Sequence, residues 1–304
     1  MTRTRKAHLF LVFLSAAVAV AIGAAYFVWP REDSEDKNLQ GCVQVLEQLG
    51  VGVGAPSSIS ECGDALETAM TGRPAGQPTK GAAIQLPAKQ SAAFEAVARK
   101  YGATGLDGTA APIPREIIPN LANAVTYYLP DVYQIIGGQV DYSSPDHATK
   151  PNAIDVDSPE MTDFLRGLAE DEASFRLVRS GMFEHMAKEI GTLTDGDFAG
   201  KSRGEPGQPQ KGDTAIGLAR VTGKVTGTLR KARLQAITAH SGEKVAEAAR
   251  DYRLYGFPHL ERLFRSRAGE FSGHSTPERT ARLEDILSEA RDVYLRRAGA
   301  QDSH

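Results

Sequence analysis

The stretch LFLVFLSAAVAVAIGAAYFVW, residues 9–29, contains no charged residue. As a helix of about 21 residues it is long enough to cross the hydrocarbon core of a bilayer, which is about 30 Å thick. Tyr26 and Trp29 lie at its far end, and aromatic rings of this kind favour the membrane interface. The stretch therefore predicts a single transmembrane helix, and this helix decides where the rest of the chain lies.

The charges on the two sides of this helix differ in sign. The basic residues before it are Arg3, Arg5 and Lys6, whereas one basic residue, Arg31, and four acidic residues follow it, namely Glu32, Asp33, Glu35 and Asp36. Lys and Arg near a membrane span are retained on the cytoplasmic side. We therefore predict a cytoplasmic basic tail over residues 1–8 and an extracytoplasmic location for everything after residue 29.

A cleaved signal peptide is the alternative interpretation of the same stretch. Gly23, Ala24 and Ala25 resemble a small-residue cleavage site. However, the apolar region of a signal peptide is usually about 7–15 residues long, and here the apolar character continues through residues 26–29. An uncleaved signal-anchor in the cell membrane is therefore favoured, and both alternatives place the remaining chain outside the cytoplasm.

The two cysteines follow the predicted anchor. An extracytoplasmic compartment is oxidising, which favours a disulfide between Cys42 and Cys62, whereas two free buried thiols are the alternative. Closing a loop of this size would stabilise the fold by about 3 kcal/mol. We expect the bond to join two helices, the second capped by Ser60, into a membrane-proximal hairpin over residues 30–70. A Gly- and Pro-rich linker follows over residues 71–90.

Apolar residues after the linker repeat at intervals of three and four, and no convincing period-two alternation occurs. This spacing predicts an all-α extracytoplasmic domain over residues 91–300 with long Gly/Pro-rich loops. The expected helices cover 91–101, 119–128, 130–137, a segment starting at Ser158 as its cap, a second stripe over 175–190, and then 218–239, 243–255, 260–268 and a last helix from Pro277.

Three glycines interrupt the longest of these helices. Gly217, Gly223 and Gly227 lie within the apolar pattern, although glycine lowers helix propensity. A neighbouring helix that approaches the backbone closely would explain why these positions lack a side chain.

Tyrosines are concentrated around the break at Leu129 and Pro130. Tyr127, Tyr128 and Tyr133 have the amphipathic character typical of protein or glycan interfaces. Their helical spacing is equally consistent with packing in the core. The sequence leaves both alternatives open.

No catalytic motif is complete. The glycines of GLARVTGKV, residues 217–225, are one position too far apart for a phosphate-binding loop, and Val225 replaces the Ser or Thr that would bind magnesium. Ser241 and Lys244 match a Ser-x-x-Lys pair, but its partner motifs are absent and Ser241 fits a helix cap. We predict no catalytic residue and no cofactor.

Metal ligands are equally incomplete. Asp155 with Asp157, and Asp195 with Asp197, could supply oxygen ligands to calcium, but the remaining ligands of a calcium loop are missing. The histidines have no metal-ligand spacing. We therefore predict no metal site.

The overall charge argues against a nucleic-acid partner. The formal net charge is −3 and becomes about −6 when the basic residues of the cytoplasmic tail are left out. A phosphate backbone is bound through a basic surface, whereas the arginines of the C-terminal third alternate with Glu and Asp.

Much of the second half resembles the helical region of uncharacterised membrane-anchored actinobacterial proteins, some encoded near type VII secretion genes. The similar segments are IPREIIPNLANAVTYYLPDVYQIIGG (113–138), DSPEMTDFLRGLAEDEASFRLVRSGMFEHM (157–186) and GLARVTGKVTGTLRKARLQAITAHSGEKV (217–245). The resemblance implies a Gram-positive envelope setting. It implies no activity and no functional residue.

Together these features predict a single-pass, extracytoplasmic helical protein that binds another envelope or secreted protein, as a non-catalytic component of the cell envelope or of secretion. The alternative is an envelope enzyme such as a cell-wall hydrolase. That alternative requires two carboxylates that face each other in a cleft, one with a raised pKa.

Overall fold

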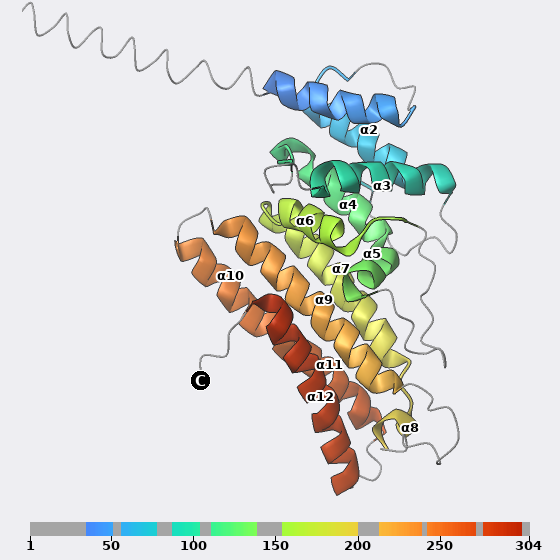
Figure 1. Cartoon of the computed structure of the whole chain (residues 1–304), viewed down its shortest axis with the longest axis vertical. Coiled ribbons are helices and arrows are strands. Elements are labelled where there is room, and N and C mark those ends of the chain that lie inside the picture. Colours follow the sequence, from blue (N-terminus) through green and yellow to red (C-terminus); the bar gives the residue numbers. More distant parts are fainter. Residues whose placement is uncertain are drawn as a thin grey trace, which may run out of the picture. The chain divides into compact units, whose positions relative to one another are not determined.

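The structure is a computed structural model, and it describes residues 35–50, 56–77, 87–103, 111–138, 154–199, 213–238, 242–271 and 276–299. These residues form helices and loops without a strand among them, which confirms the all-α prediction (Figure 1). The chain divides into two compact units, Met1–Cys62 and Gly63–His304.

The predicted transmembrane segment, residues 9–29, lies outside the described residues, as do the basic tail and the alternative cleavage site. Within the part of the chain that the structure describes, none of the helices is long and apolar enough to cross a bilayer.

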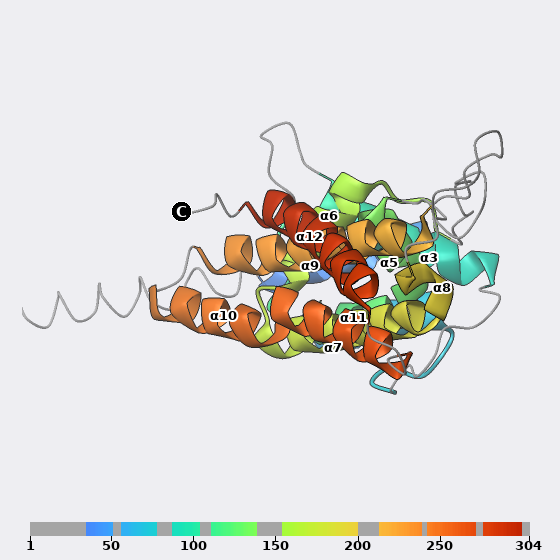
Figure 2. The ribbon, with the colours of Figure 1, turned by 90° about the horizontal axis from the view of Figure 1, so that it is seen from below.

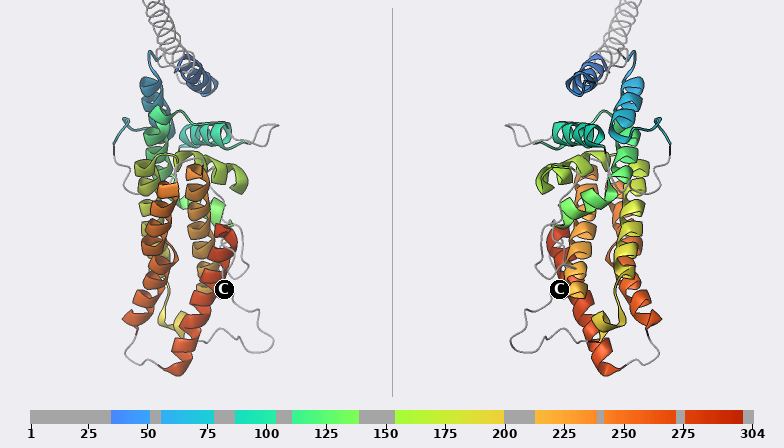
Figure 3. Two further views of the ribbon diagram at one scale, coloured as in Figure 1. Left: turned by 90° about the vertical axis from the view of Figure 1, so that its left-hand side faces the viewer. Right: turned by 90° about the vertical axis from the view of Figure 1, so that its right-hand side faces the viewer.

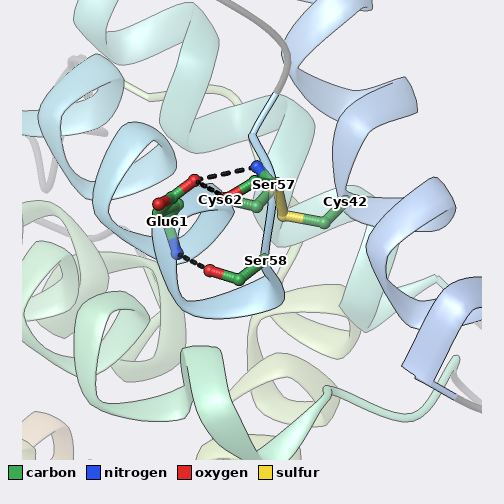
Figure 4. The surroundings of a disulfide bond; sticks show 5 residues. All are labelled: Cys42, Ser57, Ser58, Glu61 and Cys62. Atoms are coloured by element: carbon green, nitrogen blue, oxygen red, sulfur yellow. Dashed lines mark hydrogen bonds between the residues drawn. A yellow bond between two sulfur atoms is a disulfide. The ribbon is translucent and has the colours of Figure 1, made fainter. Parts of the chain in front are cut away.

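The first unit contains a helix over residues 35–48 and the start of α2 (Ile59–Thr71). The turn that follows the helix over 35–48 contains Gly50, which has a φ of 60°. The Ser58 hydroxyl accepts a hydrogen bond of 3.2 Å from the Glu61 backbone N–H, so Ser58 caps α2 (Figure 4). The prediction that Ser60 caps this helix is therefore wrong by two positions.

The second unit continues α2 and adds a series of helices that alternate with short connections. They are α3 (Ala88–Gly102), the 3-10 helix η1 (Arg115–Ile117), α4 (Ile118–Tyr127), α5 (Leu129–Gly137), α6 (Ser158–Leu168), α7 (Glu172–Gly191), α8 (Asp195–Phe198), α9 (Thr214–Ile237), α10 (Gly242–Tyr255), α11 (Phe257–Glu270) and α12 (Pro277–Ala298).

The long helix α9 is the centre of this unit. It runs alongside α7 and α12, while α10 and α11 follow one another along the same direction with only Gly256 between them (Figures 1 and 2). Helices α3 and α6 pack on each other across one end of these long helices (Figure 3). Most of α9 is buried, including Val225, Leu229 and three threonines whose hydroxyls form hydrogen bonds within the core.

The predicted helix boundaries are close to those observed. The break between α4 and α5 lies at Tyr128, next to the predicted position, because Pro130 is accommodated in the first turn of a new helix. Helix α3 begins at Ala88, before the predicted start at Ser91. Helix α6 does begin at Ser158, but its cap is Asp157, whose Oδ1 accepts from the Glu160 N–H at 2.8 Å.

The glycines of α9 explain its close packing on α12. A Cβ built on Gly223 would lie 2.3 Å from the Ala290 carbonyl oxygen, and one built on Gly227 would lie 2.7 Å from the Tyr294 carbonyl oxygen. Both contacts are with backbone, so no side-chain rotation could relieve them. The two glycines are four residues apart on one face of α9, and the predicted close approach of a neighbouring helix is confirmed for both.

Candidate functional site

A groove of about 570 Å³ opens between α7, α10 and α11. The side chains from α7 that line it are Arg176, Arg179, Ser180, Phe183, Glu184 and Ala187. The opposite side is formed by Asp251 of α10 and by His259 and Leu263 of α11. Charged, aromatic and aliphatic groups therefore meet in one concave surface, whose polar groups could orient a ligand.

His259 and Phe183 form the aromatic part of the groove. Their rings meet edge to face with centroids 4.8 Å apart. Nη2 of Arg262 lies 3.1 Å from Nδ1 of His259, so the imidazole accepts a hydrogen bond from the guanidinium. Burial lowers the pKa of His259, and the charges of Arg262 and Arg179 lower it further. The ring is therefore neutral at pH 7, and its Nε2–H is available as a donor.

Arg179 is a buried charged residue that lines the groove. It is only 6% exposed, and its guanidinium lies 3.7 Å from the Asp251 carboxylate, which joins α7 to α10. The neighbouring Arg176 pairs with Glu172 on its own helix. Because the arginines and carboxylates are paired in this way, the groove offers a balanced charge pattern and not a purely basic one.

Behind the groove, aromatic and basic side chains fill the space between α7, α9, α10 and α12. Tyr252 packs on Phe175 with ring centroids 6.4 Å apart, and the Arg233 guanidinium lies 5.8 Å from the same Phe175 ring. Arg230 donates to the Tyr294 hydroxyl at 3.2 Å. The interior next to the groove therefore contains several cations that are largely shielded from water.

The groove holds a serine and a histidine, but they are not assembled for nucleophilic catalysis. Within the described residues, His259 forms a hydrogen bond with Arg262 but not with Ser180. A general base must lie within hydrogen-bond reach of the nucleophile that it activates. The geometry is consequently better suited to binding than to acyl transfer.

The disulfide prediction is confirmed. Cys42 and Cys62 are bonded and fully buried, so the alternative of two free thiols is excluded (Figure 4). Next to the bond, Glu61 Oε2 accepts from both the backbone N–H and the hydroxyl of Ser57, each at 2.8 Å. These hydrogen bonds lower the pKa of the Glu61 carboxyl.

The tyrosines proposed as an interface belong to the core. Tyr127, Tyr128 and Tyr133 are 4%, 0% and 5% exposed. The Tyr128 hydroxyl donates to the Met70 carbonyl at 2.7 Å, and the Tyr133 ring lies edge-on to His185 at 4.7 Å. Side chains that are this deeply packed present almost no surface to a partner. Of the two alternatives, packing in the core is therefore the one that the structure supports, and an interface formed by these tyrosines is not.

The acidic pairs considered for calcium have other roles. Asp157 caps α6, and Asp197 forms a capping box with Thr194 at the start of α8. Asp155, which precedes α6, pairs with Arg99 of α3, and Asp195 of α8 pairs with Arg279 of α12. Among the described residues, no three side chains of the types His, Cys, Asp and Glu gather where they could hold a metal ion.

A carboxylate pair with one raised pKa does occur, at Asp64 and Glu67 on α2. The Asn120 side-chain amide donates to both, at 2.9 and 2.8 Å, and the Gly76 N–H donates to the second oxygen of Glu67 at 2.9 Å. Burial raises the pKa of Glu67, against the opposing effect of these hydrogen bonds. Since Glu67 is only 1% exposed, the pair holds α2 against α4 and does not form an accessible hydrolytic site.

This pair gives a pH-dependent prediction. A carboxyl whose pKa is raised on folding stabilises the protein below its usual value of 4.5 and loses that contribution as the pH rises through the folded value. The stability of the wild type relative to Glu67→Gln should therefore decrease from about pH 4 to pH 7. Urea unfolding of the full chain in detergent micelles, followed by circular dichroism, measures this difference.

The exposed Glu116 of η1 supplies the matched control, Glu116→Gln, which also removes one carboxylate. If the stability of the wild type relative to Glu67→Gln instead increases with rising pH, burial is not the dominant effect on the pKa of Glu67.

No protein-family model, curated protein or solved structure matches this chain. The groove residues were not predicted from the sequence, although one signal was present. Arg179 lies next to Val178 of the apolar α7 stripe and is four residues from Phe175, so it is on the side of the helix that packs. A charged residue at a position that packing will bury indicates either an internal ion pair or a site, and Arg179 both pairs with Asp251 and lines the groove.

Proposed function

We propose that this chain is a single-pass membrane protein whose helical body lies outside the cytoplasm and binds another envelope or secreted protein without catalysis. The observation that carries the proposal is the buried bond between Cys42 and Cys62. Disulfides persist in oxidising compartments and are rare in the cytosol. Both cysteines follow the apolar stretch 9–29 in the sequence. The charges that flank this stretch also favour a location outside the cytoplasm for the residues after it.

A binding role is supported by the groove between α7, α10 and α11. Its arginines are engaged by Asp251 and Glu172, and its histidine is neutral and hydrogen-bonded. Such a surface can recognise a partner by shape and by matched polar contacts. The resemblance to membrane-anchored actinobacterial proteins adds a Gram-positive envelope, and for some of them secretion, to this proposal.

Fractionation of a Gram-positive host that produces the full chain with a C-terminal tag tests the location. We expect the uncleaved chain to stay in the membrane through an alkaline wash, and added protease to cleave it in intact cells stripped of their wall. The control variant combines Val18→Arg and Ile22→Arg. Each charge costs about 2.5–3.5 kcal/mol near a helix centre, so this variant should lose the membrane fraction.

A full-length chain found soluble in the cytoplasm, with reactive thiols at positions 42 and 62, would overturn the proposed location. For the binding role, crosslinking in cells followed by purification from membranes should recover a specific envelope or secreted protein. Recovery of nothing above the level of the double-arginine variant would contradict that part of the proposal.

A further inference from the structure

Two buried polar groups in the interior behind the groove have no hydrogen-bond partner among the described residues. They are the Tyr252 hydroxyl of α10 and Nε of Arg230 on α9. Tyr252 is 4% exposed, so bulk water cannot satisfy its hydroxyl. Buried polar atoms in native structures are nearly always matched by protein, ordered water or a ligand. These two atoms therefore call for an explanation.

Arg230 also lacks a carboxylate. Its guanidinium donates from Nη1 to the Tyr294 hydroxyl at 3.2 Å and lies 5.7 Å from the centre of that ring. No Asp or Glu within the described residues lies within ion-pair distance of it. A partly buried guanidinium without a counter-charge is unfavourable, so the site favours an anion.

Further positive charge surrounds Tyr252. Arg233 is held by the Ala169 carbonyl, and its closest carboxylate, on Glu172, is 3.9 Å away. Arg179 lies across from Asp251, the residue that precedes Tyr252. Burial raises the pKa of Tyr252, and the charges of Arg179, Arg233 and Arg230 act in the opposite direction. The Phe175 ring that the Arg233 guanidinium approaches also contacts Tyr252, and Arg230 lies three residues before Arg233 on α9.

We propose that this interior binds one small oxyanion of the phosphate class, held by the Tyr252 hydroxyl and by Nε–H of Arg230. Both unmatched groups can donate, and Arg Nε can only donate. A ligand made of acceptor oxygens satisfies both donors and supplies the missing negative charge. Water would have to accept from both groups and would leave the positive charge uncompensated.

The groove and this interior have two residues in common. Arg179 and Asp251 line the groove and also flank the interior that contains Tyr252. The proposal does not depend on the partner-binding role or on the membrane location of the chain.

Equilibrium dialysis of the full chain in detergent micelles against labelled inorganic phosphate, at constant ionic strength in chloride, tests the site. We expect saturable binding of about one phosphate per chain. Tyr252→Phe removes only the hydroxyl, and Arg230→Lys removes Nε while keeping the charge. Because a hydrogen bond to an anion is worth about a factor of ten or more in affinity, each variant should bind at least about tenfold more weakly.

Two matched controls separate this site from general effects. Tyr133→Phe removes another buried hydroxyl without a hydrogen-bond partner among the described residues, in surroundings where a carboxylate, Glu189, acts on it. Arg265→Lys alters a surface arginine that pairs with Glu261 and Glu284. Both controls should bind phosphate as the wild type does, and circular dichroism should show equal helicity for all four variants.

Absence of saturable phosphate binding at millimolar concentrations would overturn the proposal and leave water as the occupant. Equal affinity in the wild type, Tyr252→Phe and Arg230→Lys would also overturn it, because phosphate would then bind elsewhere. Should Arg230→Lys fail to fold, Tyr252→Phe decides the question alone, since it removes no charge and keeps the packed ring.

Discussion

Gly223→Ala is expected to lower the free energy of unfolding of the helical body by about 2 kcal/mol. The added Cβ would lie 2.3 Å from the Ala290 carbonyl oxygen, so α9 and α12 must move apart. Overpacking of a tight interior typically costs about 1–3 kcal/mol. Because the contact is with backbone, we expect an overpacking cost of about 3 kcal/mol, at the upper end of this range. Alanine has a helix propensity that is better than that of glycine by about 1 kcal/mol, which leaves the net loss of about 2 kcal/mol.

The separation would affect more than one contact. Arg220 on α9 pairs with Glu289 on α12 at 2.8 Å, and Arg297 donates to the Thr228 hydroxyl at 3.2 Å. Both contacts join α9 to α12 near Gly223 and Gly227, so their distances would increase as the two helices move apart. We therefore expect Gly223→Leu to be more destabilising than Gly223→Ala.

Gly269→Ala is the matched control, because Gly269 lies near the end of α11 and a Cβ added there would have no atom within 4 Å. This variant should be neutral or slightly stabilising by helix propensity. Urea unfolding of the full chain in micelles gives both values. Equal stability of Gly223→Ala and Gly269→Ala would show that α12 does not pack on the glycine face of α9.

The sequence predicted these helices well because their apolar spacing is set by local packing. The α9 glycines are an example, since a residue without helix propensity in an otherwise regular stripe indicates a close neighbour. The identity of that neighbouring helix could not be predicted. Ala290 and Tyr294 lie far along the chain, and the pairing depends on how all the helices pack together.

Helix caps were predicted less accurately. Asp157 and Ser158 are both good capping residues, as are Ser58 and Ser60. The choice depends on where the backbone enters the first turn, which the hydrogen bonds to Glu160 and Glu61 decide. A pattern of residue types fixes such a boundary only to within a residue or two.

The candidate site was beyond prediction for a different reason. Tyr252 and Arg230 are ordinary residues in ordinary helical patterns, and each would be expected to find a partner. Only their burial without one makes them notable, and burial is a property of the packed structure. The tyrosines near Pro130, in contrast, attracted attention by clustering in sequence, yet packing places them in the core.

Replacing both Cys42 and Cys62 with alanine is expected to release the helix over residues 35–48. The bond closes a loop across a sequence separation of 20, which corresponds to about 3 kcal/mol in the chain-entropy model. A helix of this length is marginal in water without tertiary support. Backbone amides of the helix should therefore exchange with solvent about a hundredfold faster in the double variant than in the wild type.

Hydrogen exchange by mass spectrometry on the full chain measures this, with the amides of α9 as the internal control. The bond cross-links the helix over 35–48 to α2, which continues past Cys62 to buried Leu66 and Met70. Exchange in α9 should stay unchanged, and reductant should give the wild type the same profile as the variant. A helix over 35–48 that remains protected without the bond would show that packing alone holds it in place.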